Sequence, residues 1–273
     1  MLFRMEHRLK LSEVKEKQSP FINSQINATQ SFSSSIDKSQ IETIMLSGSV
    51  ARGDYFAGSM GGMIDLIVLK TPHSSVTADA LFGPNEEPTI PYHCIRREGI
   101  WYSILLLGFF TVEDFCKLPE ARKYSLFESI VLYERSNLYS KLEPVLRKAA
   151  ETEWKELFQS SFFDLNYYLS EYKVDRWKRR GEVGQLRLNL NEAVKCGIKC
   201  VYYLNDQYAP ANDRILYYSY ELARQPNDYE EIMYGLVTQK TDSIAEYEQL
   251  EMTFREKVVE FLHESGQKKF GLT

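Results

Sequence analysis

The sequence predicts an α+β fold, in which a mixed β-sheet flanked by helices over residues 1–150 is followed by an all-α helical bundle over residues 151–273. Between residues 40 and 150, short apolar runs are bounded by Gly, Pro, Asn and Ser, a pattern typical of strands. Beyond residue 150, Gly and Pro become sparse and apolar residues recur three and four positions apart, which indicates amphipathic helices. A chain of 273 residues is long enough for two such domains.

The N-terminal segment predicts helices over residues 1–39 that precede the sheet. Residues 3–18 mix Leu, Phe and Val with Lys and Glu at helical spacing. Pro20 is expected to end this helix because proline lacks the amide N–H that a helix interior needs. A second, more polar helix is expected over residues 22–36.

The centre of the first domain predicts a strand, a tight turn and a helix start in direct succession. The apolar run of residues 41–47 stops at Gly48-Ser49, where the chain turns into a helix. A glycine-rich loop over residues 57–62 precedes residues 63–70, MIDLIVLK, which are typical of a strand with one acid inside it. Residues 71–88 are rich in Pro and Ser and predict a loop with one helical turn.

The remaining elements follow from the same patterns. Strands are predicted over residues 89–98 and 99–110, joined through Glu98-Gly99 as a hairpin, and a further short strand over residues 128–135. The predicted helices cover residues 111–127, 138–150, 152–176, 185–205, 211–223 and 228–264, the last broken near Thr241.

Composition and charge exclude several classes of protein. Basic and acidic residues balance before residue 150 and acidic ones exceed basic ones after it, so an obligate nucleic-acid partner is disfavoured, although a local basic patch stays open. The longest apolar run, residues 100–110, is about half the length of a membrane span, and no membrane partner is expected. The N-terminus lacks a signal-peptide pattern, and the four scattered cysteines fit a reducing, cytoplasmic location.

One constellation of residues predicts chemistry with phosphates. A Gly48-Ser49 turn between a strand and a helix allows close backbone approach to phosphate oxygens, and the helix N-terminus offers free N–H groups. Arg52 either assists in nucleotide binding or braces the turn from within the helix. Asp65, on the next strand, is expected to direct its carboxylate to the same edge and to hold Mg²⁺ bound to a nucleoside triphosphate.

The segment LSGSVARGDYFAGSMGGMIDLIVL resembles the signature of the nucleotidyltransferase superfamily, whose members share a DNA polymerase beta-like fold. A small mixed-sheet domain followed by a helical bundle is also similar to the kanamycin nucleotidyltransferase group and its minimal relatives. The resemblance implies Mg²⁺-dependent transfer of a nucleoside monophosphate from ATP or another nucleoside triphosphate to a small hydroxylated acceptor or a protein. It is carried by Leu46, Gly48, Ser49, Ala51, Arg52, Gly53, Asp65 and Leu66.

The sequence departs from this signature at two of the family's acids. The first acid of the pair falls at Met63, whose thioether is a poor ligand for Mg²⁺. The third acid is absent from the strand of residues 100–110, and Glu98 is the nearest stand-in. Two hypotheses stay open: a working nucleotidyltransferase in which Asp65 and Glu98 are catalytic and Asp65 holds the metal, or a degenerate relative that binds only a nucleotide or a partner protein. The sequence does not choose between them, nor between a monomer and a homodimer.

A cluster of basic residues marks the second domain. Arg176, Lys178, Arg179 and Arg180 stand at the end of a predicted helix. They would meet a triphosphate or an acidic acceptor, or simply complement the negative end of the helix dipole. Paired tyrosines, such as Tyr167-Tyr168, would stack on a base or pack half-buried in the bundle.

Overall fold

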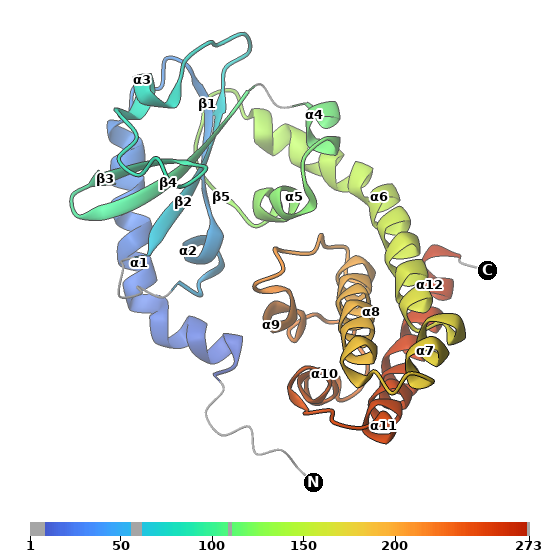
Figure 1. Ribbon diagram of the computed structural model, residues 1–273. Helices are drawn as coiled ribbons and strands as arrows, with labels where there is room; N and C mark the ends of the chain where they lie inside the picture. Colours follow the sequence, from blue (N-terminus) through green and yellow to red (C-terminus); the bar gives the residue numbers. More distant parts are fainter. Residues whose placement is uncertain (1–8, 56–61, 109–110, 272–273) are drawn as a thin grey trace. The chain divides into compact units, whose positions relative to one another are not determined.

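The computed structural model describes residues 9–55, 62–108 and 111–271, and it confirms the predicted fold class (Figure 1). The described residues before Ala150 form one compact unit, and those from Ala150 onward form a second. The first unit holds the whole β-sheet. Every helix in the described ranges is too short or too polar to cross a lipid bilayer.

The sheet is mixed, with five strands in the order β3-β4-β2-β1-β5. Strands β2 and β4 run parallel, whereas β1 pairs antiparallel with both β2 and β5, and β3 pairs antiparallel with β4. Glu98 and Gly99 form the β3–β4 hairpin turn, as predicted, and both have positive φ, at 50° and 82°. The strands are β1 (Ile41–Ser47), β2 (Met63–Lys70), β3 (His93–Arg97), β4 (Ile100–Leu107) and β5 (Ile130–Glu134).

The N-terminal helix α1 (Leu11–Ser35) is continuous, so the expectation that Pro20 ends a helix is wrong. A proline inside a helix costs about 3 kcal/mol, because its ring displaces the preceding turn and one hydrogen bond is lost. Apolar side chains are buried on both sides of the proline, Leu11 and Val14 before it and Ile22 after it. This burial holds both halves of the helix against the unit and offsets the cost.

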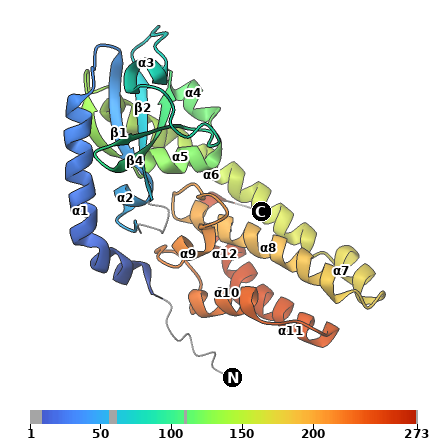
Figure 2. The same cartoon turned by 60° about the vertical axis from the view of Figure 1, so that its left-hand side comes forward.

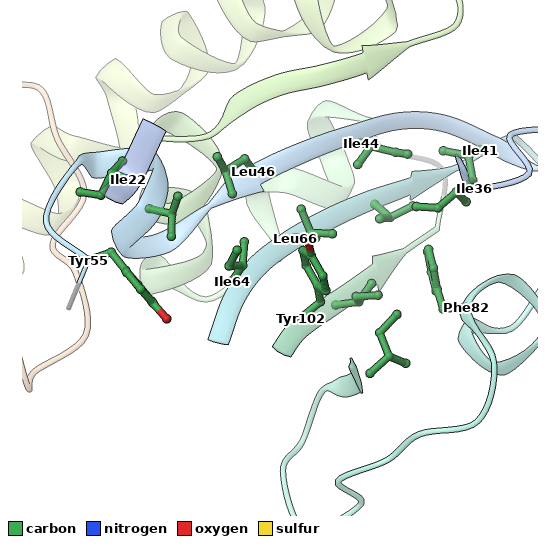
Figure 3. Packing of buried hydrophobic residues seen from close by; sticks show 14 residues of the cluster. Ile22, Ile36, Ile41, Ile44, Leu46, Tyr55, Ile64, Leu66, Phe82 and Tyr102 are labelled. Carbon is green, nitrogen blue, oxygen red and sulfur yellow. The ribbon is translucent and has the colours of Figure 1, made fainter. Parts of the chain in front are cut away.

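Helices cover both faces of the sheet (Figure 2). On one face, Ile22 and Ile36 from the α1 segment pack with Ile44, Leu66 and other strand residues in one buried cluster (Figure 3). On the other face, the Oγ of Ser47 donates a hydrogen bond of 3.3 Å to the carbonyl of Ser125 in α5. Burial on both faces explains why all seven residues of β1 are buried. The shorter helices of this unit are α2 (Gly48–Arg52), α3 (Ala78–Phe82), α4 (Val112–Cys116) and α5 (Glu120–Phe127).

The second unit is helical in all of its described secondary structure. Its centre is α8 (Val183–Leu204), which buries Leu190, Val194 and Val201 among its neighbours. The break predicted near Thr241 lies between α10 and α11. The other helices are α6 (Leu138–Tyr168), which begins in the first unit, α7 (Glu171–Lys178), α9 (Ile215–Ser219), α10 (Tyr229–Thr238), α11 (Ile244–Phe254) and α12 (Glu260–Phe270), with a π-helical turn at Arg255–Val259.

Candidate functional site

The junction of β1 and α2 places Gly48 directly against Asp65. Strand β1 ends at Ser47 in extended backbone, and α2 begins at once with Gly48 at a φ of +70°. A Cβ on Gly48 would overlap the Oδ2 of Asp65 and lie 3.0 Å from its Cγ. Glycine is therefore required here by its own backbone angle and by the neighbouring carboxylate. The reason expected from the sequence was different, namely that a phosphate approaches the backbone closely at this turn.

Asp65 is the single carboxylate in a row of side chains that crosses one face of the sheet. Register pairs Asp65 with Ser47 on β1 and with Ser103 on β4, and Ser103 with Cys94 on β3. Directly paired residues place their side chains on the same face. Near this row, burial raises the pKa of the Tyr55 hydroxyl, a hydrogen bond with the Gly62 backbone lowers it, and the charge of Asp65 raises it. The row therefore places one acid among hydroxyl and thiol groups.

Met63 occupies the position beside Asp65, and its surroundings contain sulfur and aromatic groups. Its Sδ accepts a hydrogen bond of 3.9 Å from the Sγ of Cys94, which is fully buried. Trp101 pairs with Met63 across the β2–β4 ladder. Across the β2–β4 ladder, Met63 and Asp65 thus face Trp101 and Ser103. Neither can supply a carboxylate.

The structure does not bring Glu98 to Asp65. Asp65 pairs with Ser103, and Ile100, the first residue of β4, lies three positions before Ser103, which is about 10 Å along a strand. Glu98 lies still farther away in the hairpin turn. A glutamate side chain cannot span that separation, so Glu98, the expected stand-in for the third acid, lies away from Asp65.

Arg52 lies in an internal ion-pair cluster. Its Nη1 is 3.2 Å from the Oε2 of Glu128, and its Nε is 3.5 Å from the Oδ1 of Asp54. The side chains of Arg52 and Asp54 are almost fully buried. Two carboxylates thus face one guanidinium. This arrangement favours the bracing role of Arg52, which ties α2 to the end of α5, over direct contact with a phosphate.

We expect Arg52→Gln to destabilise the first unit in a pH-dependent manner. Burial raises the pKa of Glu128 above its ordinary value, whereas Tyr124 and Arg52 lower it and Asp54 raises it. A carboxyl whose pKa is raised by folding stabilises the folded state at low pH and loses that contribution as the pH rises through the raised pKa. Without Arg52 the charged Glu128 carboxylate has lost a buried partner, so the free energy of unfolding should fall by about 3 kcal/mol near neutral pH. Glu128 protonates at low pH, so the loss should be smaller there.

Urea denaturation of the native protein and of Arg52→Gln, from about pH 4 to about pH 8, measures this difference. Lys117→Gln is a matched control because Lys117 forms an exposed ion pair with Glu113 on α4. It should change the free energy of unfolding by well under 1 kcal/mol. An effect of Arg52→Gln that is equal at all pH values would contradict the role assigned to Glu128.

The described residues offer a ligand for one phosphate-bound Mg²⁺ but not the hard donors that a second ion would need. Mg²⁺ is commonly held by one or two carboxylates together with substrate phosphates, and Asp65 supplies one such ligand beside the Gly48-Ser49 turn. A second ion needs further hard donors, and Met63 and Trp101 stand in those places. Within the described ranges, no group of three or more His, Cys, Asp and Glu residues could hold a metal ion.

Three residues in the same row as Asp65, namely Ser47, Cys94 and Ser103, were not identified from the sequence. They come from three other strands, and only the register of the sheet aligns them. The alternation of residues along β4 hints that Trp101 and Ser103 share a face. No signal in the sequence says which residues of β2 they meet.

No protein-family model matches this chain, and no curated protein matches it either. Among solved structures, it is similar to a nucleotidyltransferase-like protein from Exiguobacterium sibiricum 255-15, with 12% sequence identity and a TM-score of 0.46. That alignment covers 92% of this chain and 78% of the other.

Proposed function

We propose that this chain binds a nucleoside triphosphate together with Mg²⁺ at the Gly48-Ser49 turn and Asp65, and that it does not transfer the nucleotide. The observation that carries the proposal is the contact between Gly48 and the Asp65 carboxylate. This contact puts a hard oxygen ligand for Mg²⁺ next to backbone suited to phosphate. The segment that holds both residues is the one that resembles the nucleotidyltransferase signature.

The lack of transfer follows from the ligands around Asp65. When two metal ions are bound at such a site, they position the phosphates, activate the acceptor hydroxyl and neutralise the developing charge. Here Met63, Trp101 and Ser103 stand where further carboxylates would hold the second ion. Losing that ion removes several kcal/mol of transition-state stabilisation, and each 1.4 kcal/mol is about tenfold in rate. The protein therefore retains binding and loses catalysis.

Electrostatics makes the binding depend on Mg²⁺. The carboxylate of Asp65 repels a metal-free triphosphate, and the charge of Arg52 is already compensated by Asp54 and Glu128. A divalent cation between Asp65 and the phosphates reverses this repulsion. Ser49, the second residue of the turn, has a hydroxyl that would donate to the same phosphate.

Calorimetry with ATP, GTP, CTP and UTP, each with and without Mg²⁺, tests the proposal. We expect binding only with Mg²⁺, weakened about tenfold by Asp65→Asn, which removes the charge but keeps the shape. Glu98→Gln is the matched control and should leave the affinity unchanged, because Glu98 lies far from Asp65 along the sheet. Unchanged affinity in Asp65→Asn would place the nucleotide elsewhere. No binding of any nucleotide would favour a role confined to a protein partner.

Two assays measure transfer separately. One follows pyrophosphate release from ATP in the presence of kanamycin. The other follows incorporation of radioactive AMP from labelled ATP into the protein itself. We expect neither reaction above the level of Asp65→Asn. Turnover by the native protein that Asp65→Asn abolishes would overturn the inactive assignment and leave a working nucleotidyltransferase.

A further inference from the structure

Three cations in and just after α7 each lie over an aromatic ring. The Nζ of Lys173 is 4.3 Å from the centroid of the Tyr167 ring. The guanidinium carbon of Arg176 is 4.5 Å from the centroid of Tyr172, and these two side chains also form a hydrogen bond. The guanidinium carbon of Arg180 is 4.9 Å from the centroid of Trp177. We call these six residues the α7 stripe.

The cations of the α7 stripe have no acidic partner among the residues that the structure describes, unlike the basic residues beside them. Lys178 is 2.9 Å from Glu248, and Arg179 is 2.7 Å from Asp175. In contrast, Lys173, Arg176 and Arg180 form no ion pair within the described ranges. Three positive charges are therefore left without compensation in a chain that carries a net charge of -5.

The three cations follow one another at short intervals along α7 and the turn after it. Lys173 and Arg176 are three positions apart and share one face of α7, and Arg180 lies in the turn that follows the helix, where its N–H donates to the carbonyl of Trp177. Seven positions separate Lys173 from Arg180, which is about 10 Å if the turn continues near the helical rise of 1.5 Å per residue. With a rise of 3.4 Å per base, that length corresponds to about three stacked nucleotides.

Exposure of the rings distinguishes this surface from a simple phosphate site. The side chains of Tyr172 and Tyr167 are 67% and 45% exposed, and Phe163, one turn before Tyr167 on α6, is 68% exposed. Exposed rings beside uncompensated cations match a ligand that has both flat bases and phosphates. An acidic peptide would use the charges but gain little from the rings.

We propose that the α7 stripe binds single-stranded nucleic acid without sequence preference. The three cations contact consecutive phosphates, and bases stack on the outer faces of Tyr172 and Tyr167. The site is independent of the nucleotide site proposed above, because it uses none of the same residues. The net negative charge of the chain opposes long polyanions, so binding is weak and depends on low salt.

Fluorescence anisotropy of a short labelled oligouridylate, titrated with the full-length protein, tests the stripe. We expect log Kd to rise with log salt with a slope of about 2, from three phosphate contacts at about 0.7 each. Lys173→Gln, Arg176→Gln and Arg180→Gln combined should abolish binding. Tyr172→Leu should weaken it at least fivefold at an unchanged salt slope, because it removes about 1 kcal/mol or more of stacking.

Matched controls use the ion-paired neighbours. Lys178→Gln and Arg179→Gln remove charge from the same segment and should each weaken binding less than twofold. Asp65→Asn should bind the oligonucleotide normally, and excess Mg²⁺-ATP should not displace it, so failure here is distinguishable from failure of the proposed nucleotide site. Circular dichroism checks that each variant is folded.

The proposal is overturned if no binding occurs at low salt, or if Lys178→Gln and Arg179→Gln weaken binding as much as the stripe variants. It is also overturned if polyglutamate binds as tightly as the oligonucleotide and Tyr172→Leu has no effect. That last result would make the stripe a docking site for an acidic protein.

Discussion

Gly48→Ala is expected to destabilise the first unit by about 4 kcal/mol, at least twice the loss that its backbone angle alone would cause. A φ of +70° costs an L-residue about 1–2 kcal/mol. The added methyl group would also overlap the Asp65 carboxylate, which is held on a central strand between Ser47 and Ser103. Rotation of the carboxylate would still leave the added methyl group 3.1 Å from the Cβ of Asp65, whose position the β1–β2 ladder fixes. The strain of this overlap adds at least as much again.

Gly99→Ala separates the two causes. Gly99 has a φ of +82° in the hairpin turn, and an added Cβ would meet nothing within 4 Å. The free energy of unfolding of Gly99→Ala should therefore fall by only about 1–2 kcal/mol. Urea denaturation gives the free energies of unfolding for both variants.

The double variant Gly48→Ala, Asp65→Ala removes the overlap but keeps the backbone angle. Its loss should be smaller than the sum of the two single losses by about 1 kcal/mol or more, because the two residues are in contact. Additive losses would mean that the carboxylate does not limit residue 48.

Met63→Asp is expected to lower the stability of the metal-free protein by about 3 kcal/mol and to create a response to Mg²⁺. The new carboxylate replaces a thioether that contacts the buried thiol of Cys94, so its charge is poorly solvated. It also shares a strand face with Asp65 and repels it. Mg²⁺ between the two carboxylates relieves both effects. Mg²⁺ at a free concentration of about 100 times its Kd would raise the free energy of unfolding by about 2.7 kcal/mol, because the ion binds only the folded state.

Thermal unfolding with and without Mg²⁺ and ATP measures this response. Met63→Asn is the matched control, because asparagine has the shape of aspartate without its charge. The Tm of this variant should not respond to Mg²⁺ alone. The native protein should respond only slightly, having one carboxylate in place of two. A large Mg²⁺-dependent rise in the native Tm that Asp65→Asn abolishes would mean that another acid completes the site. The working-enzyme hypothesis would then replace the inactive one.

Some features of this protein were determined by the sequence alone, because they depend on neighbours along the chain. The strand of residues 63–70 and the Glu98-Gly99 turn were predicted because alternation, apolar runs and turn residues are local signals. The all-helical nature of the described elements after Ala150 follows from a periodicity of 3.6 in the same way. The single acid in the second strand, with Met63 two positions before it, was also visible from the sequence.

Other features were decided only by the tertiary structure, because they depend on contacts between distant segments. Pro20 does not break α1, since burial on both sides of it outweighs a local preference. Arg52 is compensated by Glu128, 76 residues farther along the chain. The register of the sheet aligns Asp65 with Ser103 and moves Glu98 away from it. A pattern in one strand fixes which of its residues share a face, but only pairing between strands fixes what they face.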